Sequence, residues 1–315
     1  MRARLLCTFL SAAVACWADQ AVPDFHLPDV NPHSPRHGAM VSPRDYLLQV
    51  SAYYFGEAGC GYCRGQFGYL QQMQKELKAA SPDINIEIVG INIPNDAQDN
   101  PAAISGQTLA WLQDSLDATQ SAWTNWQVTW RDVRIIDPSN KLIAVYNLTE
   151  HDLLNPTNYL ALKRTFLQAA QAVDSDGDHL PDYWELHYFG NLNAAPGEDA
   201  DGDGFDNFTE FAFGTDPTDP NSHPNFSPAV MSTVQPELIT LSFRRQAGAV
   251  LDYFVESSTD LSHWVYDPNQ IQTLQGATAM YDGKGTAAAS YGLVVEPQPW
   301  GYLRIRALPR AIPGP

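Results

Sequence analysis

The spacing of apolar residues changes several times along the chain, and the clearest change lies in its first half. A nearly continuous apolar and aromatic run at residues 46–55 is typical of a buried strand. The segment 56–59 interrupts this run with two glycines and a glutamate. Apolar residues then recur at helical spacing, at Phe67, Leu70, Met73 and Leu77. We therefore predict a buried strand, a tight turn and an amphipathic helix.

The same half continues with alternating element types. Its last helix carries Leu160, Leu167 and Ala170 on one face. The order strand, helix, strand, helix, hairpin, helix predicts an α/β domain with a mixed sheet over residues 45–172. After the first helix we predict a strand at 84–93, a helix at 109–116, a hairpin of 133–137 and 142–147, and a helix at 159–172.

The final part of the chain, residues 226–310, has short alternating runs and no helical period. Ile239, Leu241 and Phe243 alternate with polar residues, and Gly283 lies in a turn sequence. We predict an all-β sandwich, a β-domain similar to those at the C-termini of exported bacterial proteins. Its aromatic residues are expected to pack in the core, and the alternative is that exposed ones bind a cell-surface or glycan partner. Residues 19–44 are rich in Pro and His, and we expect an irregular lead-in there.

Length and charge limit the choice of class. At 315 residues the chain is longer than one typical domain, so a multi-domain protein is expected. The net charge of -18 argues against a nucleic-acid partner, because phosphate binding requires clustered Lys and Arg. No Lys or Arg lies between Arg164 and Arg244. The acidic residues within this stretch lie between the two predicted domains and form a candidate cation-binding segment.

The N-terminal residues have the pattern of an export signal. Arg2 and Arg4 precede a short apolar run at 5–15. Small residues before Asp19 predict a signal peptide of residues 1–18, and hence a periplasmic, cell-surface or extracellular protein. An earlier cut that leaves Cys16 first would give a lipoprotein, and an uncleaved segment would serve as an anchor.

Two of the four cysteines remain after such a cleavage, and they carry the candidate chemistry. Cys60 and Cys63 lie between the predicted strand and helix, so Cys60 is placed at a helix N-terminus, where the helix dipole favours a thiolate. The spacing brings both sulfurs within bonding reach. Two other interpretations stay open: half of a zinc site with His33 and His37, or a purely structural disulfide.

The strand, the C-x-x-C sequence, the helix and the later hairpin together resemble the thioredoxin superfamily, in particular its periplasmic redoxin branch. The resemblance covers residues 45–172. It implies a thiol–disulfide oxidoreductase that acts on protein thiols or disulfides. Cys60 would be the nucleophile, and Cys63 the residue that resolves the mixed disulfide.

The sequence departs from that family at two places. Gly59 replaces the tryptophan that precedes the first cysteine, and Gly61-Tyr62 fills the middle of the motif. The family's cis-proline before the hairpin is also missing, and the matching position is near Arg131. We predict that Arg131 faces the sulfurs, where a cation lowers the pKa of a nearby thiol.

The acidic interval, residues 174–220, contains two loops with the same spacing of oxygen-bearing side chains. Alternate positions on a tight loop converge on one centre, and calcium takes six to eight oxygen ligands. Gly204 sits where a sharp turn is needed, whereas the first loop has His179. The candidate ligands are Asp174, Asp176, Asp178, Asp182 and Glu185 in the first loop, and Asp199, Asp201, Asp203, Asn207 and Glu210 in the second.

These loops resemble thrombospondin type 3-like calcium repeats, which implies structural calcium. We therefore expect a calcium-loop linker between the two domains, and no organic cofactor. A solvated acidic spacer is the alternative.

The leading hypothesis is an exported thiol–disulfide oxidoreductase with structural calcium sites and a C-terminal interaction domain. One alternative is a thiol peroxidase-like redoxin in which Cys60 attacks peroxide. Another is a calcium-dependent cell-surface binding protein whose redoxin module is vestigial.

Overall fold

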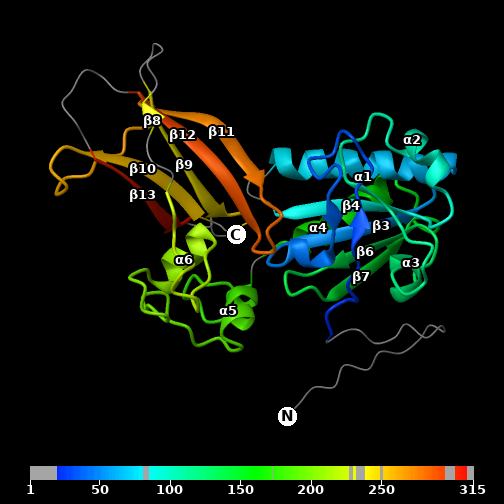
Figure 1. The fold of residues 1–315 in the computed structure, drawn as a ribbon, viewed down its shortest axis with the longest axis horizontal. Coiled ribbons are helices and arrows are strands. Elements are labelled where there is room, and N and C mark those ends of the chain that lie inside the picture. The colour runs from blue at the N-terminus through cyan, green and yellow to red at the C-terminus, as the bar shows by residue number, and fades with distance from the viewer. Residues whose placement is uncertain are drawn as a thin grey trace.

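The computed structural model describes residues 20–80, 85–171, 173–226, 230–231, 238–248, 251–294 and 302–310. The predicted signal peptide lies outside the described residues. Figure 1 shows an α/β half followed by a half built of two small helices and β-strands. No helix within the described ranges is long and apolar enough to cross a membrane.

A five-stranded mixed sheet forms the centre of the α/β half, in the order β5-β4-β3-β6-β7. β3 is parallel to β4 and β4 to β5, whereas β6 runs antiparallel to both β3 and β7. Parallel strands joined by a helix, followed by an antiparallel hairpin, are the topology of a thioredoxin-like domain. The strands are β3 (Val50–Gly56), β4 (Ile86–Asn92), β5 (Trp111–Gln113), β6 (Asp132–Ile136) and β7 (Leu142–Asn147).

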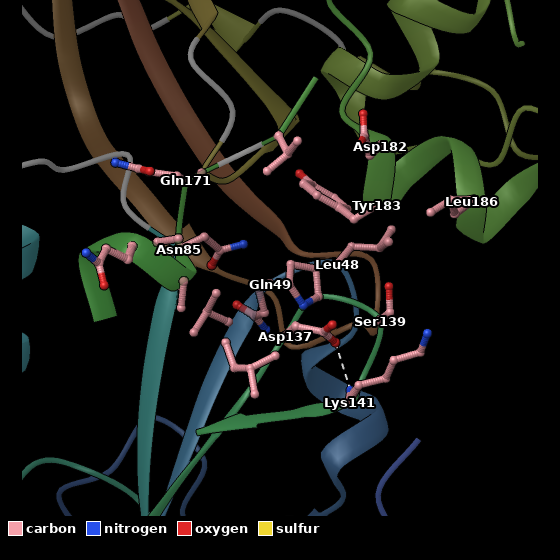
Figure 2. Close-up of a pocket in the computed structure, with 18 of the residues that line it drawn as sticks. Leu48, Gln49, Asn85, Asp137, Ser139, Lys141, Gln171, Asp182, Tyr183 and Leu186 are labelled. Atoms are coloured by element: carbon pink, nitrogen blue, oxygen red, sulfur yellow. Dashed lines mark hydrogen bonds between the residues drawn. The ribbon is translucent and has the colours of Figure 1, made fainter. Parts of the chain in front are cut away.

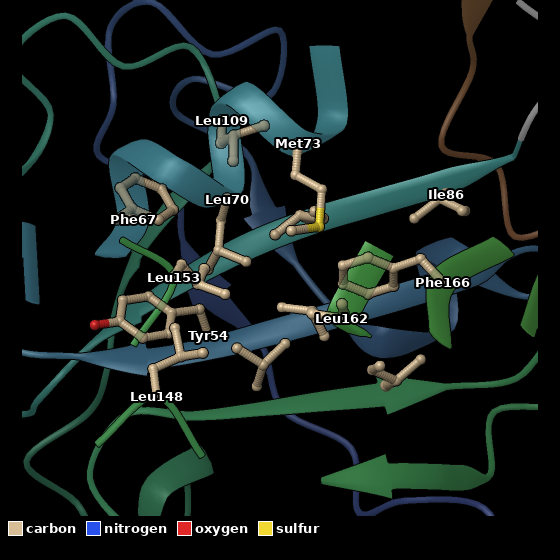
Figure 3. Close-up of a cluster of buried hydrophobic side chains, with 14 of the residues drawn as sticks. Tyr54, Phe67, Leu70, Met73, Ile86, Leu109, Leu148, Leu153, Leu162 and Phe166 are labelled. Atoms are coloured by element: carbon tan, nitrogen blue, oxygen red, sulfur yellow. The ribbon is translucent and has the colours of Figure 1, made fainter. Parts of the chain in front are cut away.

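Two long helices, α1 (Gly61–Ala80) and α4 (Pro156–Ala169), cover one face of this sheet. Figure 3 shows Phe67, Leu70 and Met73 of α1 packed onto the strands beside Leu162 and Phe166 of α4. Each of these five side chains is fully buried. The predicted apolar face of α1 is therefore confirmed. In α4 the buried residues differ from the predicted face, since Leu160 and Leu167 are exposed.

The N-terminal residues cover the opposite face, together with the short helix α3 (Ala122–Asn125). The segment expected as an irregular lead-in contains the two-stranded pair β1 (Leu27–Pro28) and β2 (Met40–Val41). Phe25 packs against Tyr53 and Trp126, with ring centroids 5.6 and 5.5 Å apart. The lead-in is thus part of the core of the α/β half.

One predicted element was wrong, and the start of another differs. Residues 109–116 are not helical, because Trp111 begins β5 and pairs with Gly90 of β4. The Trp111 ring lies over Gly90 so closely that a Cβ there would be 2.3 Å away. The run at 46–55 becomes a strand only from Val50. Before it lies the short helix η1 (Pro43–Tyr46), whose N-cap is the side chain of Ser42.

Between β4 and β5 the chain forms the short helices η2 (Ala97–Asp99) and α2 (Asn100–Ala103). Beyond α4, the helices α5 (Asp182–Tyr188) and α6 (Asn207–Phe213) follow the two acidic loops. The remaining strands are β8 (Val230–Met231), β9 (Leu238–Gln246), β10 (Leu251–Ser258), β11 (Ile271–Ala279), β12 (Thr286–Val294) and β13 (Tyr302–Pro309).

These six strands make two sheets, β11-β12-β9-β8 and the pair β10-β13. Phe243 of the larger sheet contacts Tyr253 of the smaller one, and Phe213 of α6 packs against both rings. Trp184 of α5 is fully buried and packs against Phe211 of α6. The acidic interval is therefore more than a spacer, because its helices form part of the core of the second half.

The two halves meet along the ends of β3 and β4. Asn85 donates hydrogen bonds to the carbonyls of Ala247 and Gly285, and Tyr281 packs on Tyr46. A cavity of about 380 Å³ lies at this junction, between the β3–β4 end of the sheet and Tyr183 of α5 (Figure 2). The cysteines lie at the opposite end of β3.

Candidate functional site

The cysteine pair lies where β3 ends and α1 begins. Cys60 immediately precedes the helix and is partly exposed, whereas Cys63, within its first turn, is 1% exposed. The backbone N–H of Cys63 donates to the Cys60 sulfur at 3.2 Å. The prediction that Cys60 lies at the helix N-terminus is therefore confirmed. The accessible sulfur also accepts a hydrogen bond from the helix backbone.

Hydrogen bonds to β4 and to the loop that follows β4 fix the turn before Cys60. Asn92, fully buried, accepts from the N–H of Ala58 at 2.9 Å, and Asp96 accepts from the N–H of Gly59 at 2.6 Å. A Cβ on Gly59 would lie 2.9 Å from the Asp99 carboxylate. The close approach of these carboxylates explains why glycine occupies the position that is tryptophan in the family it resembles.

Arg131, just before β6, reaches the Cys60 sulfur, as predicted. Its Nη2 lies 3.8 Å from the Cys60 Sγ, and its Nη1 donates to the Thr149 hydroxyl at 3.1 Å. The backbone of Arg131 has φ of 69°, in the left-handed region. Its N–H donates to the Phe55 carbonyl, and its carbonyl accepts from the N–H of Leu148. These two bonds fix the unusual conformation and so the position of the guanidinium.

Two aromatic rings flank the Arg131 guanidinium. Its central carbon lies 5.0 Å from the ring centre of Tyr62 and 5.7 Å from that of Trp130, within cation–π range. Tyr62 is 41% exposed and Trp130 43% exposed, so they form an open aromatic rim beside Cys60. Trp130 and Thr149 are two site residues that the sequence did not predict. The only available signal for Trp130 was its position next to Arg131.

The two thiols have opposite tendencies to ionise. Burial raises the pKa of Cys60, but hydrogen bonds from Cys63 and Arg131 outweigh it, so the net pKa is lowered. Burial and the hydrogen bond with Cys60 raise the pKa of Cys63. Cys60 therefore ionises more readily than Cys63, and it is also the more exposed of the two.

The acidic loops bring together part of each predicted ligand set. Carboxylate oxygens of Asp174, Asp176 and Asp178 lie within 4.8 Å of one another, and so do those of Asp199, Asp201 and Asp203. Asp182 instead accepts from the backbone and hydroxyl of Ser175. Gly204 and His179 both have positive φ, 97° and 81°. His179 therefore adopts a conformation that glycine adopts more easily.

Three predicted ligands farther along the loops are buried with unpaired oxygens. Both carboxylate oxygens of Glu210, one of Glu185 and the amide oxygen of Asn207 have no hydrogen-bond partner. Burial, and then the neighbouring aspartates, raise the pKa of Glu210 to about 8 and that of Glu185 to about 7. Buried carboxylates without partners are costly, and a divalent cation is the kind of group that satisfies them.

The zinc interpretation finds no support in the geometry. His33 and His37 are exposed. Within the described ranges, the groups of three or more candidate metal ligands are the two aspartate clusters, and neither includes a cysteine.

Comparisons with known proteins give matches among solved structures. No family model and no curated protein matches the chain. A candidate thiol:disulfide interchange protein of Chlorobium tepidum is 21% identical over 47% of this chain and 94% of its own, with a TM-score of 0.37. The thioredoxin domain of a Bacteroides vulgatus thiol-disulfide oxidoreductase is 19% identical over 47% and 96%, with a TM-score of 0.37. Copper-bound ScoI of Arabidopsis thaliana is 15% identical over 47% and 99%, with a TM-score of 0.38.

The class of the α/β half follows from its own strand order, with α1 and α4 on one face of the sheet. It is a thioredoxin-like domain whose C-x-x-C pair lies at the carboxyl end of the central parallel strands.

Proposed function

We propose that the protein is an exported thiol–disulfide oxidoreductase that exchanges disulfides with protein substrates through Cys60 and Cys63. The observation that supports this most directly is the contrast between the two sulfurs. Cys60 is accessible and receives hydrogen bonds from the Cys63 N–H and from Arg131, whereas Cys63 is buried within reach of it. An accessible thiolate with a buried partner is the arrangement that thiol–disulfide exchange requires.

The exchange proceeds in two displacements. The Cys60 thiolate attacks one sulfur of a substrate disulfide, forms a mixed disulfide and releases the other substrate sulfur as a thiolate. Cys63 then loses its proton and attacks Cys60, which releases the second substrate thiolate and leaves the Cys60–Cys63 disulfide. The reverse sequence transfers a disulfide to a substrate dithiol. Arg131 stabilises negative charge on Cys60 in either direction.

Trapping the mixed disulfide tests the proposal. We expect a Cys63→Ser variant to accumulate a covalent adduct with a small disulfide-bonded protein, because its Cys60 still attacks but nothing resolves the product. Cys60→Ser is the matched control and should form no adduct. Adducts with neither variant would contradict the proposal. Rapid consumption of hydrogen peroxide by wild type, without protein-disulfide exchange, would instead favour the peroxidase alternative.

A second proposed property is structural calcium binding in the acidic interval, which would brace a C-terminal interaction domain. The observation in its favour is Glu210, fully buried with both carboxylate oxygens unpaired beside the Asp199, Asp201 and Asp203 cluster. The residues that would hold the ion in the second loop are these three aspartates and Glu210. In the first loop they are Asp174, Asp176, Asp178 and Glu185.

Calorimetric titration of the calcium-free protein tests this property. Extracellular calcium modules have Kd values of about 10⁻⁴–10⁻³ M, so heat should be released or absorbed on titration into this range. Magnesium is the control, since its smaller ion demands stricter octahedral geometry and should bind more weakly. Absence of any calcium-dependent heat at millimolar concentration would contradict the proposal.

A further inference from the structure

The charge next to the cysteine pair differs between its oxidised and reduced forms. In the disulfide both sulfurs are neutral. In the reduced form negative charge develops more readily on Cys60 than on Cys63, because the Cys60 sulfur faces Arg131 and accepts from the Cys63 N–H, which lower its pKa, while burial raises the pKa of Cys63. Any fixed charge beside Cys60 therefore interacts strongly with one redox state and weakly with the other.

Arg131 supplies such a charge, and its position is fixed by contacts that do not involve the sulfurs. Its side chain donates to Thr149 and lies within cation–π range of the rings of Tyr62 and Trp130. Its backbone bonds Phe55 and Leu148 on neighbouring segments. None of these contacts requires a particular redox state of the cysteines.

Three other polar side chains near the pair make hydrogen bonds to groups other than the Cys60 sulfur. On α1, Arg64 donates to the carbonyls of Ala58 and Gly59. Behind the turn, the Asp96 carboxylate accepts from the Gly59 N–H and from Gln98. From β3, the Tyr54 hydroxyl donates to the Cys63 carbonyl at 3.1 Å. Arg131 is the cation whose guanidinium is directed at the Cys60 sulfur.

We propose that Arg131 makes the Cys60–Cys63 pair a disulfide donor: by stabilising the Cys60 thiolate it favours the reduced protein, so the oxidised protein transfers its disulfide to substrate dithiols. The inference rests on the proposed exchange function and assigns its direction. The principle is general, because an interaction made with the reduced state alone raises the reduction potential. The neutral proline expected at this position from the family resemblance would provide no such charge.

The transfer balances in atoms and electrons. A substrate thiolate attacks the Cys60 sulfur, the Cys60–Cys63 bond breaks, and Cys63 leaves and takes up a proton. The second substrate thiolate attacks its partner sulfur in the mixed disulfide, and Cys60 leaves as a thiolate beside Arg131. The substrate dithiol loses two electrons and two protons; the protein disulfide gains the two electrons, Cys63 takes one proton, and the other goes to solvent. A thiol with a lowered pKa is the faster leaving group, so Arg131 also speeds the second step.

The equilibrium with glutathione, measured on the full-length protein, tests the proposal. We compare wild type with Arg131→Met, which keeps the length of the side chain and the Cβ at the positive φ but removes the charge. Arg164→Met is the matched control, because it removes one cation from an exposed position on α4, away from the pair. Arg131→Lys keeps the charge. Thermal unfolding of each variant checks that the fold is retained.

We expect Arg131→Met to shift the equilibrium at least tenfold toward the disulfide, which corresponds to about 30 mV or more. Arg131→Lys should shift it less, and Arg164→Met should leave it within about threefold of wild type. Oxidised wild type mixed with reduced thioredoxin should end almost entirely reduced, and the thiolate absorbance of Cys60 should persist to lower pH than in Arg131→Met.

An equilibrium that does not change in Arg131→Met would overturn the inference, and so would a wild-type pair as reducing as thioredoxin. In both cases exchange itself still occurs, so the proposed function would stand. If neither wild type nor any variant exchanges with glutathione or thioredoxin, the proposed function fails and the inference fails with it.

Discussion

The cysteine pair and the second acidic loop differ in whether the chain provides partners for their charged groups. At the pair, the Cys60 sulfur receives a backbone hydrogen bond and faces the Arg131 guanidinium, both from within the chain. At the loop, three aspartates gather beside a fully buried Glu210 whose carboxylate has no partner. Both sites concentrate negative charge, but only the first contains its own counter-charge.

The difference shows which site the polypeptide completes by itself. A thiolate that forms beside a fixed guanidinium needs nothing from solution. Buried unpaired carboxylates raise the free energy of the folded state unless they are protonated or bind a cation. We therefore expect the reactivity of the pair to be independent of calcium, and the stability of the acidic interval to depend on it.

The largest expected effect separates the two cysteines. At pH 7 iodoacetamide should label Cys60 at least 100-fold faster than Cys63, because the lowered pKa of the accessible Cys60 increases its thiolate fraction, while Cys63 is buried and its pKa is raised. As the pH falls below 7, Cys60 should keep more of its reactivity than an ordinary thiol of pKa about 8.5. Peptide mass spectrometry after brief treatment measures both rates. EDTA should not change the ratio, and faster labelling of Cys63 would reverse the assigned roles.

Calcium removal should have the next largest effect, confined to the acidic interval. With a Kd of about 10⁻⁴–10⁻³ M, 10 mM calcium stabilises the bound form by about 1.5–3 kcal/mol, so EDTA should speed proteolysis at residues 174–220 by about 10- to 100-fold. Limited proteolysis with mapping of the cut sites measures this. An equal rate of proteolysis with and without calcium would contradict ion binding in this interval.

Substitution of Glu210 tests whether its carboxylate is a ligand of the ion. Glu210→Gln keeps the shape but removes the charge, so we expect calcium affinity to fall about tenfold or more. In EDTA the same variant should unfold at a higher temperature than wild type, because it no longer buries an unpaired carboxylate. Calorimetry measures the change in calcium affinity, and thermal unfolding measures the change in stability. Glu198→Gln, an exposed change nearby, is the control, and equal behaviour of the two variants would refute the role of Glu210.

The smallest expected effect distinguishes the two loops. His179→Gly should raise calcium affinity of the first loop about fivefold, since glycine adopts a positive φ without the cost of about 1 kcal/mol that a Cβ brings. Gly204→Ala should weaken the second loop by the same reasoning. We also expect Asp201→Ala to weaken binding more than Asp176→Ala. Titrations of these variants with one loop disabled measure the difference, and equal affinities would show that the turn residue does not matter.

Much of the α/β half could be predicted because its signals are local. The apolar spacing of Phe67, Leu70 and Met73 predicted α1, and the turn before Lys141 predicted the β6–β7 hairpin. Counting along that hairpin was also enough to place Arg131 opposite Cys60. In each case a short stretch of sequence contains both the signal and the structure that follows from it.

Other elements depended on distant partners. The apolar run around Trp111 suits a helix or a strand equally well, and pairing with β4 across Gly90 made it a strand. Trp130 and Thr149 became site residues because the chain folds back between β6 and β7 to enclose Arg131. Neither outcome could be obtained from periodicity alone.

The sequence by itself determined the C-x-x-C pair at a strand-to-helix junction and two loops with the same oxygen spacing, because these depend on residues close together in the chain. Only the tertiary structure decided which charges are paired. Glu210 is buried within the second half, and its carboxylate has no hydrogen-bond partner. The fold also brings Arg131 to Cys60, which lies 71 positions earlier in the sequence. The free energy of a charge depends on its surroundings in space, and those surroundings exist only once distant segments have packed together.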